Sequence, residues 1–136
     1  MVNIDDVPEP FDNRAAWCWV AQRSRILYTG GTSSARAWML TPHDPQWTLE
    51  IYPDMHSPRG THASISIGIV PYVFGGSGPT AKCEKLVNRT WEMLPDMHTP
   101  RSYCSCTETS GKIFVAGNGS EFLEEFNPTT HVFRVL

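Results

Sequence analysis

The sequence lacks any long apolar run. None of its stretches approaches the roughly 18 consecutive apolar residues that a bilayer-spanning helix requires, so we expect no membrane contact. The first ten residues, MVNIDDVPEP, have neither the basic flank nor the apolar centre of a secretory signal. These two absences predict a cytoplasmic protein in a reducing compartment.

An excess of positive charge is also missing. The 136 residues carry 11 Lys and Arg against 14 Asp and Glu, which gives a formal net charge of −3. A chain that binds nucleic acid usually carries a basic stripe, so we expect no nucleic-acid partner. Hydrophobic content of 40% and charged content of 18% are typical of one globular domain with one core.

Motifs that would indicate catalysis are absent. We find no HExxH, no phosphate-cradling glycine loop and no Gly-x-Ser-x-Gly, and we predict no catalytic residue and no cofactor. The histidines at 56 and 98 occupy the same position of a repeat, which favours structural or solvent-facing roles over metal binding. Only four cysteines occur, and we expect buried thiols rather than metal ligands: Cys18, Cys83, Cys104 and Cys106.

The sequence does contain a repeat. LPDMHTPR, which ends at Arg101, matches YPDMHSPR, which ends 42 residues earlier at Arg59, with six of eight positions identical. Glycines follow 16 residues after each arginine, at 75 and 117. The same spacing counted back from Gly30 predicts an arginine at 14, and one is present. A period near forty indicates an array of small supersecondary units.

Each unit is expected to form four short strands. In the middle unit they fall at 61–67, 69–74, 83–87 and 90–94, rich in β-branched and aromatic residues and bounded by Gly, Pro and Asn. Pro71 lacks a backbone donor, which predicts a bulge or an irregular entry to the second strand. The units span 14–52, 53–94 and 95–136, and residues 1–13 align with the last strand of a preceding unit and its exit loop.

Three features recur in one register: a Pro-Arg start, a strand ending in Gly-Gly, and an aromatic residue opening the fourth strand. The aromatic residues are Trp47, Trp91 and Phe133, which we expect to fill the gaps between neighbouring sheets. With these features the chain resembles the kelch repeats of β-propellers, although Ala116-Gly117-Asn118 departs from an intact Gly-Gly. The resemblance implies an all-β fold of about three four-stranded antiparallel blades.

Three blades do not make a closed ring, because propellers usually have about four to eight. Two blade faces would then be exposed and prone to aggregation. We therefore expect either additional blades or self-association to cover them.

The resemblance also implies a function. Kelch blades often act as non-catalytic modules for protein–protein interaction, and the arginine that starts the innermost strand can bind acidic peptides. Transferred to this chain, that implies a protein or peptide partner, with an acidic one favoured, bound by five residues: Arg14, Arg59, Arg101, His62 and Tyr103. In the alternative interpretation the arginines pair with Asp54, Asp96 or loop carbonyls and hold the turn.

Other functions stay open at this point. The module could recognise substrates within an adaptor such as a ubiquitin ligase or a cytoskeletal scaffold, by analogy alone. The chain could instead be a propeller enzyme or a metal-binding kelch protein, or a truncated remnant with only a structural role.

Overall fold

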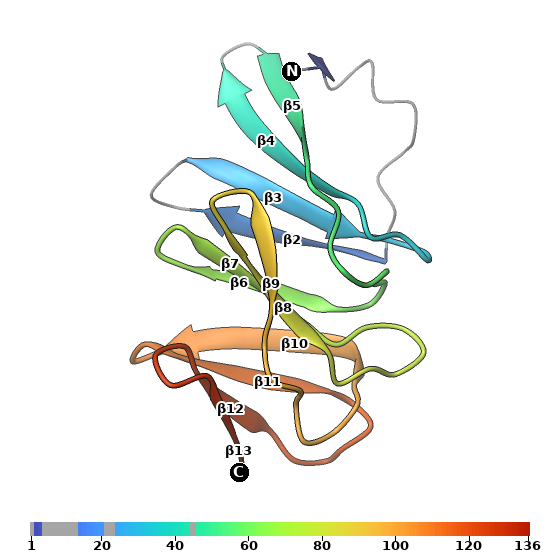
Figure 1. Cartoon of the computed structure of the whole chain (residues 1–136), viewed down its shortest axis with the longest axis vertical. Coiled ribbons are helices and arrows are strands. Elements are labelled where there is room, and N and C mark those ends of the chain that lie inside the picture. Colours follow the sequence, from blue (N-terminus) through green and yellow to red (C-terminus); the bar gives the residue numbers. More distant parts are fainter. Residues whose placement is uncertain (1, 4–13, 21–23, 44–45) are drawn as a thin grey trace.

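The computed structural model describes residues 2–3, 14–20, 24–43 and 46–136. These residues form three antiparallel β-sheets that follow one another along the long axis of the molecule, with the second sheet in the middle (Figure 1). The all-β prediction is therefore confirmed. The described residues contain no helix long and apolar enough to cross a membrane.

Each sheet is built from strands in sequence order. The first contains β2 (Ala15–Val20), β3 (Arg25–Gly30), β4 (Ala37–His43) and β5 (Gln46–Tyr52), with β1 (Val2–Asn3) added beside β5. The second contains β6 (Ala63–Ile67), β7 (Val70–Phe74), β8 (Cys83–Val87) and β9 (Thr90–Met93). The third contains β10 (Ser102–Thr109), β11 (Lys112–Asn118), β12 (Glu124–Asn127) and β13 (Val132–Val135).

The strands of the second sheet fall within one or two residues of their predicted bounds. Of the bulge or irregular entry predicted at Pro71, the bulge is absent. The β6–β7 register runs without a shift from Ile67 opposite Val70 to Ala63 opposite Phe74. Pairing of β7 with β8 begins only at Tyr72. The β7–β8 ladder is the one in which the missing N–H of Pro71 would have been needed, and it begins after this residue. The strand therefore accommodates the proline without a kink.

Residues Val2 and Asn3 lie beside the first sheet. They pair antiparallel with β5, Val2 opposite Leu49 and Asn3 opposite Thr48. The sheet thus has five strands where four were expected. Most of the 1–13 segment, predicted to be the last strand of a preceding unit and its exit loop, lies outside the described residues, so that assignment stays a prediction.

Two apolar clusters hold the three sheets together. Trp91 lies in the cluster between the first and second sheets and is 5% exposed, and Phe133 lies in the cluster between the second and third and is 7% exposed. Both fill gaps between sheets as predicted. Trp47 is 38% exposed, because it belongs to the first sheet and has no described neighbouring sheet to cover it.

The glycines at the end of the second strand of the first and second units allow the sheets to approach closely at one end. A Cβ at Gly30 would lie 2.1 Å from the carbonyl oxygen of Arg59, and a Cβ at Gly75 would lie 2.7 Å from that of Arg101. The backbone N–H groups of Gly31 and Gly76 donate to those same two carbonyls at 2.8 and 2.9 Å. Any side chain would prevent this contact, so the Gly-Gly pair is a junction between sheets.

Candidate functional site

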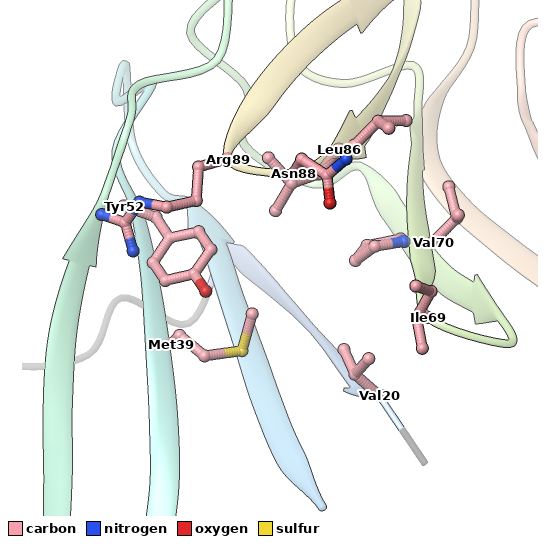
Figure 2. A pocket seen from close by; sticks show the side chains of 10 residues that line it. Val20, Met39, Tyr52, Ile69, Val70, Leu86, Asn88 and Arg89 are labelled. Carbon is pink, nitrogen blue, oxygen red and sulfur yellow. The ribbon is translucent and has the colours of Figure 1, made fainter. Parts of the chain in front are cut away.

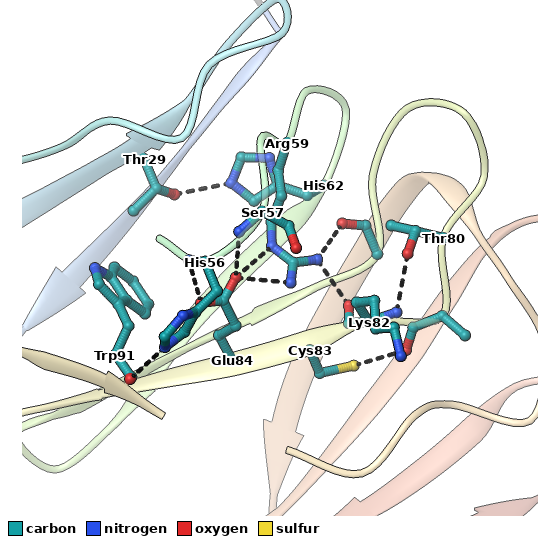
Figure 3. Close-up of polar contacts among 12 residues, drawn as sticks. Thr29, His56, Ser57, Arg59, His62, Thr80, Lys82, Cys83, Glu84 and Trp91 are labelled. Atoms are coloured by element: carbon teal, nitrogen blue, oxygen red, sulfur yellow. Dashed lines mark hydrogen bonds and ion pairs between the residues drawn. The ribbon is translucent and has the colours of Figure 1, made fainter. Parts of the chain in front are cut away.

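Arg59 lies in the interior, just before β6, the first strand of the second sheet (Figure 3). Its Nη2 and Nε donate to Oε2 of Glu84 at 2.9 and 3.3 Å. Its Nη1 donates to the carbonyl oxygens of Gly75 and Lys82 at 2.8 and 2.7 Å. The guanidinium is 1% exposed and satisfied within its own sheet, so it is not displayed to a partner.

Arg101 repeats the ion pair in the third sheet, but its buried Nη1 has no hydrogen-bond partner among the described residues. Its Nη2 lies 3.1 Å from Oε2 of Glu124, and its Nε donates to the same oxygen at 3.1 Å. Nη2 also donates to the carbonyl oxygen of Phe122 at 2.7 Å. Arg101 too is 1% exposed.

The two glutamates also hold the preceding loops. Oε1 of Glu84 accepts the backbone N–H of His56 at 2.7 Å, and Oε1 of Glu124 accepts that of His98 at 2.6 Å. Each histidine Nε2 in turn lies within hydrogen-bonding distance of a backbone carbonyl oxygen, that of Trp91 at 2.9 Å for His56. The repeated histidines are therefore structural, as predicted.

Arg59 and Arg101 thus hold the turns, as the alternative interpretation predicted, but Asp54 and Asp96 were the wrong choice of acidic partners. Asp96 forms an exposed ion pair with Lys82 at 3.0 Å, while the buried partners are glutamates on β8 and β12. The sequence does contain a signal for these partners. Glu84 and Glu124 occupy the same position in successive units, two residues before the apolar residue at 86 or 126. A surface carboxylate would hold an arginine less firmly, because water screens it.

Arg14 is placed differently from the other two arginines. In the first sheet the position of Glu84 and Glu124 is occupied by Trp38, so the equivalent buried ion pair cannot form. Arg14 is exposed. Among the three arginines, it is the one whose charge reaches the surface.

The first strands of the three units, β2, β6 and β10, bring three of the five predicted residues together. A pocket of about 530 Å³, here called the inner-edge pocket, lies where β2, β6 and β10 begin, side by side. The Thr61 N–H donates to the Arg14 carbonyl at 2.7 Å, and the Cys104 N–H donates to the Thr61 carbonyl at 3.0 Å. The pocket is lined by Arg14, Ala15, Thr61, His62, Tyr103 and Cys104.

His62 is 5% exposed and neutral at physiological pH. Burial, with a smaller contribution from the charge of Arg59, lowers the pKa of His62 to about 3. Its Nε2 lies 2.8 Å from the Thr29 hydroxyl (Figure 3), and its Nδ1 has no hydrogen-bond partner among the described residues. The pocket therefore contains a neutral imidazole with one unused ring nitrogen.

Tyr103 is the most exposed aromatic side chain of the pocket, at 67%. Its backbone φ is 48°, and Thr61, at the same position of the previous unit, has φ 53°. A left-handed backbone is uncommon for a bulky residue and costs free energy, which points to a functional or geometric constraint. The left-handed backbone of Tyr103 coincides with the irregularity in the pairing of β10 with β11 between Ser102 and Ser105.

The cysteines show no features of nucleophiles. All four are free thiols. Cys18 and Cys83 are buried as expected, whereas Cys104 and Cys106 are only half-buried. Burial raises the pKa of Cys18 to about 11 and that of Cys83 to about 12. Burial also raises the pKa of Cys104, which lines the inner-edge pocket, so this thiol stays protonated at neutral pH. Within the described ranges no three His, Cys, Asp or Glu side chains are grouped as metal ligands.

Comparison with known proteins supports the fold alone. No family model matches the sequence. No curated protein matches it either. The solved structure of YjhT is similar with a TM-score of 0.75 and 17% sequence identity, over 94% of this chain and 52% of that one. The chain thus spans about half the length of YjhT, and at this identity the likeness carries no functional statement.

Proposed function

We propose that this chain is a segment of a kelch-type β-propeller and serves as a non-catalytic module that binds a protein or peptide partner at the inner-edge pocket. The observation that carries the proposal is the placement of Tyr103, which is 67% exposed and held in a left-handed backbone beside Arg14 and His62. Exposed aromatic and arginine side chains on a rigid scaffold are the residues that dominate binding energies at interfaces.

The chemistry of the pocket favours an acidic peptide. Arg14 supplies a planar guanidinium fork suited to a carboxylate. Tyr103 supplies a ring face for an apolar or amide group, whereas the Nδ1 of His62 is buried and does not reach a ligand in this arrangement. The proposed binding residues are therefore fewer than the five that were predicted. Arg59 and Arg101 would affect binding only by holding the shape of the loops, because they donate to backbone carbonyls and do not contact the partner.

Two matched sets of fluorescent peptides would test this proposal. One set carries Asp and Glu, and the other carries Asn and Gln at the same positions; anisotropy reports binding to each. We expect preference for the acidic set and losses of about tenfold or more with Arg14→Gln and with Tyr103→Ala. Arg134→Gln, which neutralises an arginine on the outermost strand of the third sheet, is the control. Equal binding of both sets, or equal losses in Arg14→Gln and Arg134→Gln, would reject the site.

We further propose that the outer faces of the first and third sheets are covered in the working protein, by a second copy or by further blades. The face of the first sheet turned away from the second sheet carries a cross-strand row of Trp17, Tyr28, Trp38 and Ile51. Trp17 and Ile51, at the two ends of the row, are 44% and 64% exposed, whereas Tyr28 and Trp38 between them are buried. Large exposed apolar side chains of this kind are usual at interfaces and hazardous when left in water.

Sedimentation of the 136-residue chain tests that proposal. We expect association into dimers or larger species, since two copies would approach the length of YjhT. A compact monomer with a single cooperative melting transition would contradict it.

A further inference from the structure

A second pocket lies at the opposite end of the innermost strands from the inner-edge pocket. Strand β2 begins with Ala15 in the inner-edge pocket and ends with Val20 in the second pocket, a separation of roughly 17 Å for an extended strand. The volume is about 380 Å³, within the usual range for small-molecule sites. We call it the inter-sheet pocket; its lining is Val20, Met39, Tyr52, Ile69, Val70, Pro71, Leu86, Val87, Asn88 and Arg89.

The lining is apolar and comes from two sheets. Met39 and Tyr52 of the first sheet form one wall, and Val20, Ile69 and Val70 lie across from them (Figure 2). Leu86, which is 4% exposed, adds apolar surface from the second sheet. Ile69, on the β6–β7 turn, keeps 44% of its surface exposed. An apolar group that enters the pocket would remove this surface from water, which is favourable.

The polar side of the pocket is Arg89, on the turn between β8 and β9. Its guanidinium carbon lies 4.1 Å from the centre of the Tyr52 ring. It forms an ion pair with Glu50, and its Nη2 donates to the carbonyl oxygen of Ile51 at 3.1 Å. Arg89 therefore reaches from the second sheet to the first and fixes one edge of the pocket.

Two features of Arg89 point to a ligand. Both Asn88 and Arg89 have left-handed backbones, with φ 47° and 65°. Glycine is the usual second residue of such a turn, so an arginine there is a costly choice that needs a reason. In addition, its contacts with Glu50 and Ile51 leave further N–H donors of the five on a guanidinium.

The charge balance at this edge decides the class of ligand. Among the described residues that line the pocket, Arg89 is the one that carries a charge, and Glu50 already forms an ion pair with it. A carboxylate ligand would be repelled by Glu50, whereas a neutral carbonyl oxygen could accept from Arg89 or from the Asn88 amide. We propose that the inter-sheet pocket binds an uncharged small molecule with an aromatic or branched aliphatic body and one carbonyl oxygen.

The methionines of the chain supply the assay. Met39 lines the pocket, while Met97 is buried in the other apolar cluster and Met93 is exposed on β9. With ¹³C-methyl methionine, 4-phenyl-2-butanone should shift the Met39 signal in a saturable way and leave those of Met93 and Met97 nearly unchanged. Its anionic counterpart, 4-phenylbutyrate, should bind at least about tenfold more weakly.

Two variants separate the apolar and polar contributions. Arg89→Asn keeps a residue that tolerates the left-handed backbone and removes the guanidinium, and should weaken binding of the ketone about tenfold. Ile69→Ser removes apolar lining at an exposed turn position and should weaken it about three- to tenfold. Arg36→Asn, at an exposed arginine on the loop between β3 and β4, should change nothing.

The proposal is overturned by any of three results. The first is an equal shift of the Met39, Met93 and Met97 signals. The second is tighter binding of 4-phenylbutyrate than of the ketone, and the third is unchanged affinity for the ketone in both Arg89→Asn and Ile69→Ser. Melting curves of each variant show whether it is folded; if Arg89→Asn is not, Ile69→Ser decides the outcome.

Discussion

The guanidinium of Arg59 and the carboxylate of Glu84 meet in the interior, 2.9 Å apart, and neither side chain is exposed. Arg101 and Glu124 form the same pair one unit later. Each pair joins the loop that enters a sheet to the third strand of that sheet. The stretch that repeats most closely in the sequence is therefore the connection between sheets, and its arginine holds that connection in place.

Removal of one partner should be costly. Arg59→Met leaves the Glu84 carboxylate buried without its cation and frees the carbonyls of Gly75 and Lys82, and we expect a loss of about 3–5 kcal/mol in the free energy of unfolding. The double variant Arg59→Met/Glu84→Leu should recover part of this loss. Urea denaturation at one fixed protein concentration measures both.

The exposed pair of Lys82 and Asp96, 3.0 Å apart, is the matched control. Lys82→Met should cost no more than about 1 kcal/mol, because water screens a surface pair. Similar losses for Arg59→Met and Lys82→Met would show that the buried pair is not stabilising the connection.

Replacing the glycine at position 75 should lower the stability of the fold more than replacing the glycine at position 78. Both have left-handed backbones, with φ 68° and 72°, but a Cβ at 75 would lie 2.7 Å from the Arg101 carbonyl oxygen, while one at 78 meets nothing within 4 Å. Gly78→Ala should cost about 1–2 kcal/mol from backbone strain alone. Gly75→Ala should cost about 1–3 kcal/mol more, because the junction must also move apart. Equal melting temperatures for the two variants would contradict this.

The two tryptophans that open a fourth strand should differ in their effect on stability. Trp91 is 5% exposed and its Nε1 donates to the Pro53 carbonyl at 2.8 Å, so Trp91→Ala should cost about 3–5 kcal/mol. Trp47→Ala should cost clearly less in the isolated chain, since that side chain is 38% exposed. Chemical denaturation of the two variants side by side gives the comparison, and an equal loss would show that the Trp47 side chain is also covered in solution.

His62 should make stability depend on pH. Its pKa is about 3 in the fold, chiefly through burial, against about 6.5 in the unfolded chain. The unfolded state therefore binds a proton that the folded state does not, so its contribution is fully present above about pH 6.5 and is lost as the pH falls toward 3. The slope from this one group reaches about 1.4 kcal/mol per pH unit.

His62→Gln removes that titration and keeps a polar group next to Thr29. Denaturation between pH 7 and pH 4 should show a shallower loss of stability in the variant than in the parent chain. Parallel profiles would mean that His62 becomes protonated in the folded state without penalty.

Much of the fold could be predicted from the repeat. The strands of the middle unit and the roles of Trp91 and Phe133 follow from short-range patterns, because alternation, turn residues and spacing act within about ten residues. Of the two irregularities predicted at Pro71, the bulge is absent, because pairing on that side of the strand starts later, at Tyr72. That difference depends on how far a neighbouring strand extends, which local sequence does not show.

The candidate site was predicted only in part. Arg14, His62 and Tyr103 do line one pocket, but Arg59 and Arg101 are buried against glutamates that the arginine spacing did not reveal. The inter-sheet pocket, with Arg89 from one sheet over Tyr52 of another, had no signal in the sequence.

The sequence by itself determined the number of units, their register and the positions of their strands, since these depend on contacts between near neighbours along the chain. Only the tertiary structure decided which arginine reaches the surface. Trp38 stands in the first sheet where the other two sheets have a glutamate, and that position meets the arginine only after the strands have paired. The burial of a charge is set by partners that lie 23 to 25 residues away along the chain, and no local pattern specifies them.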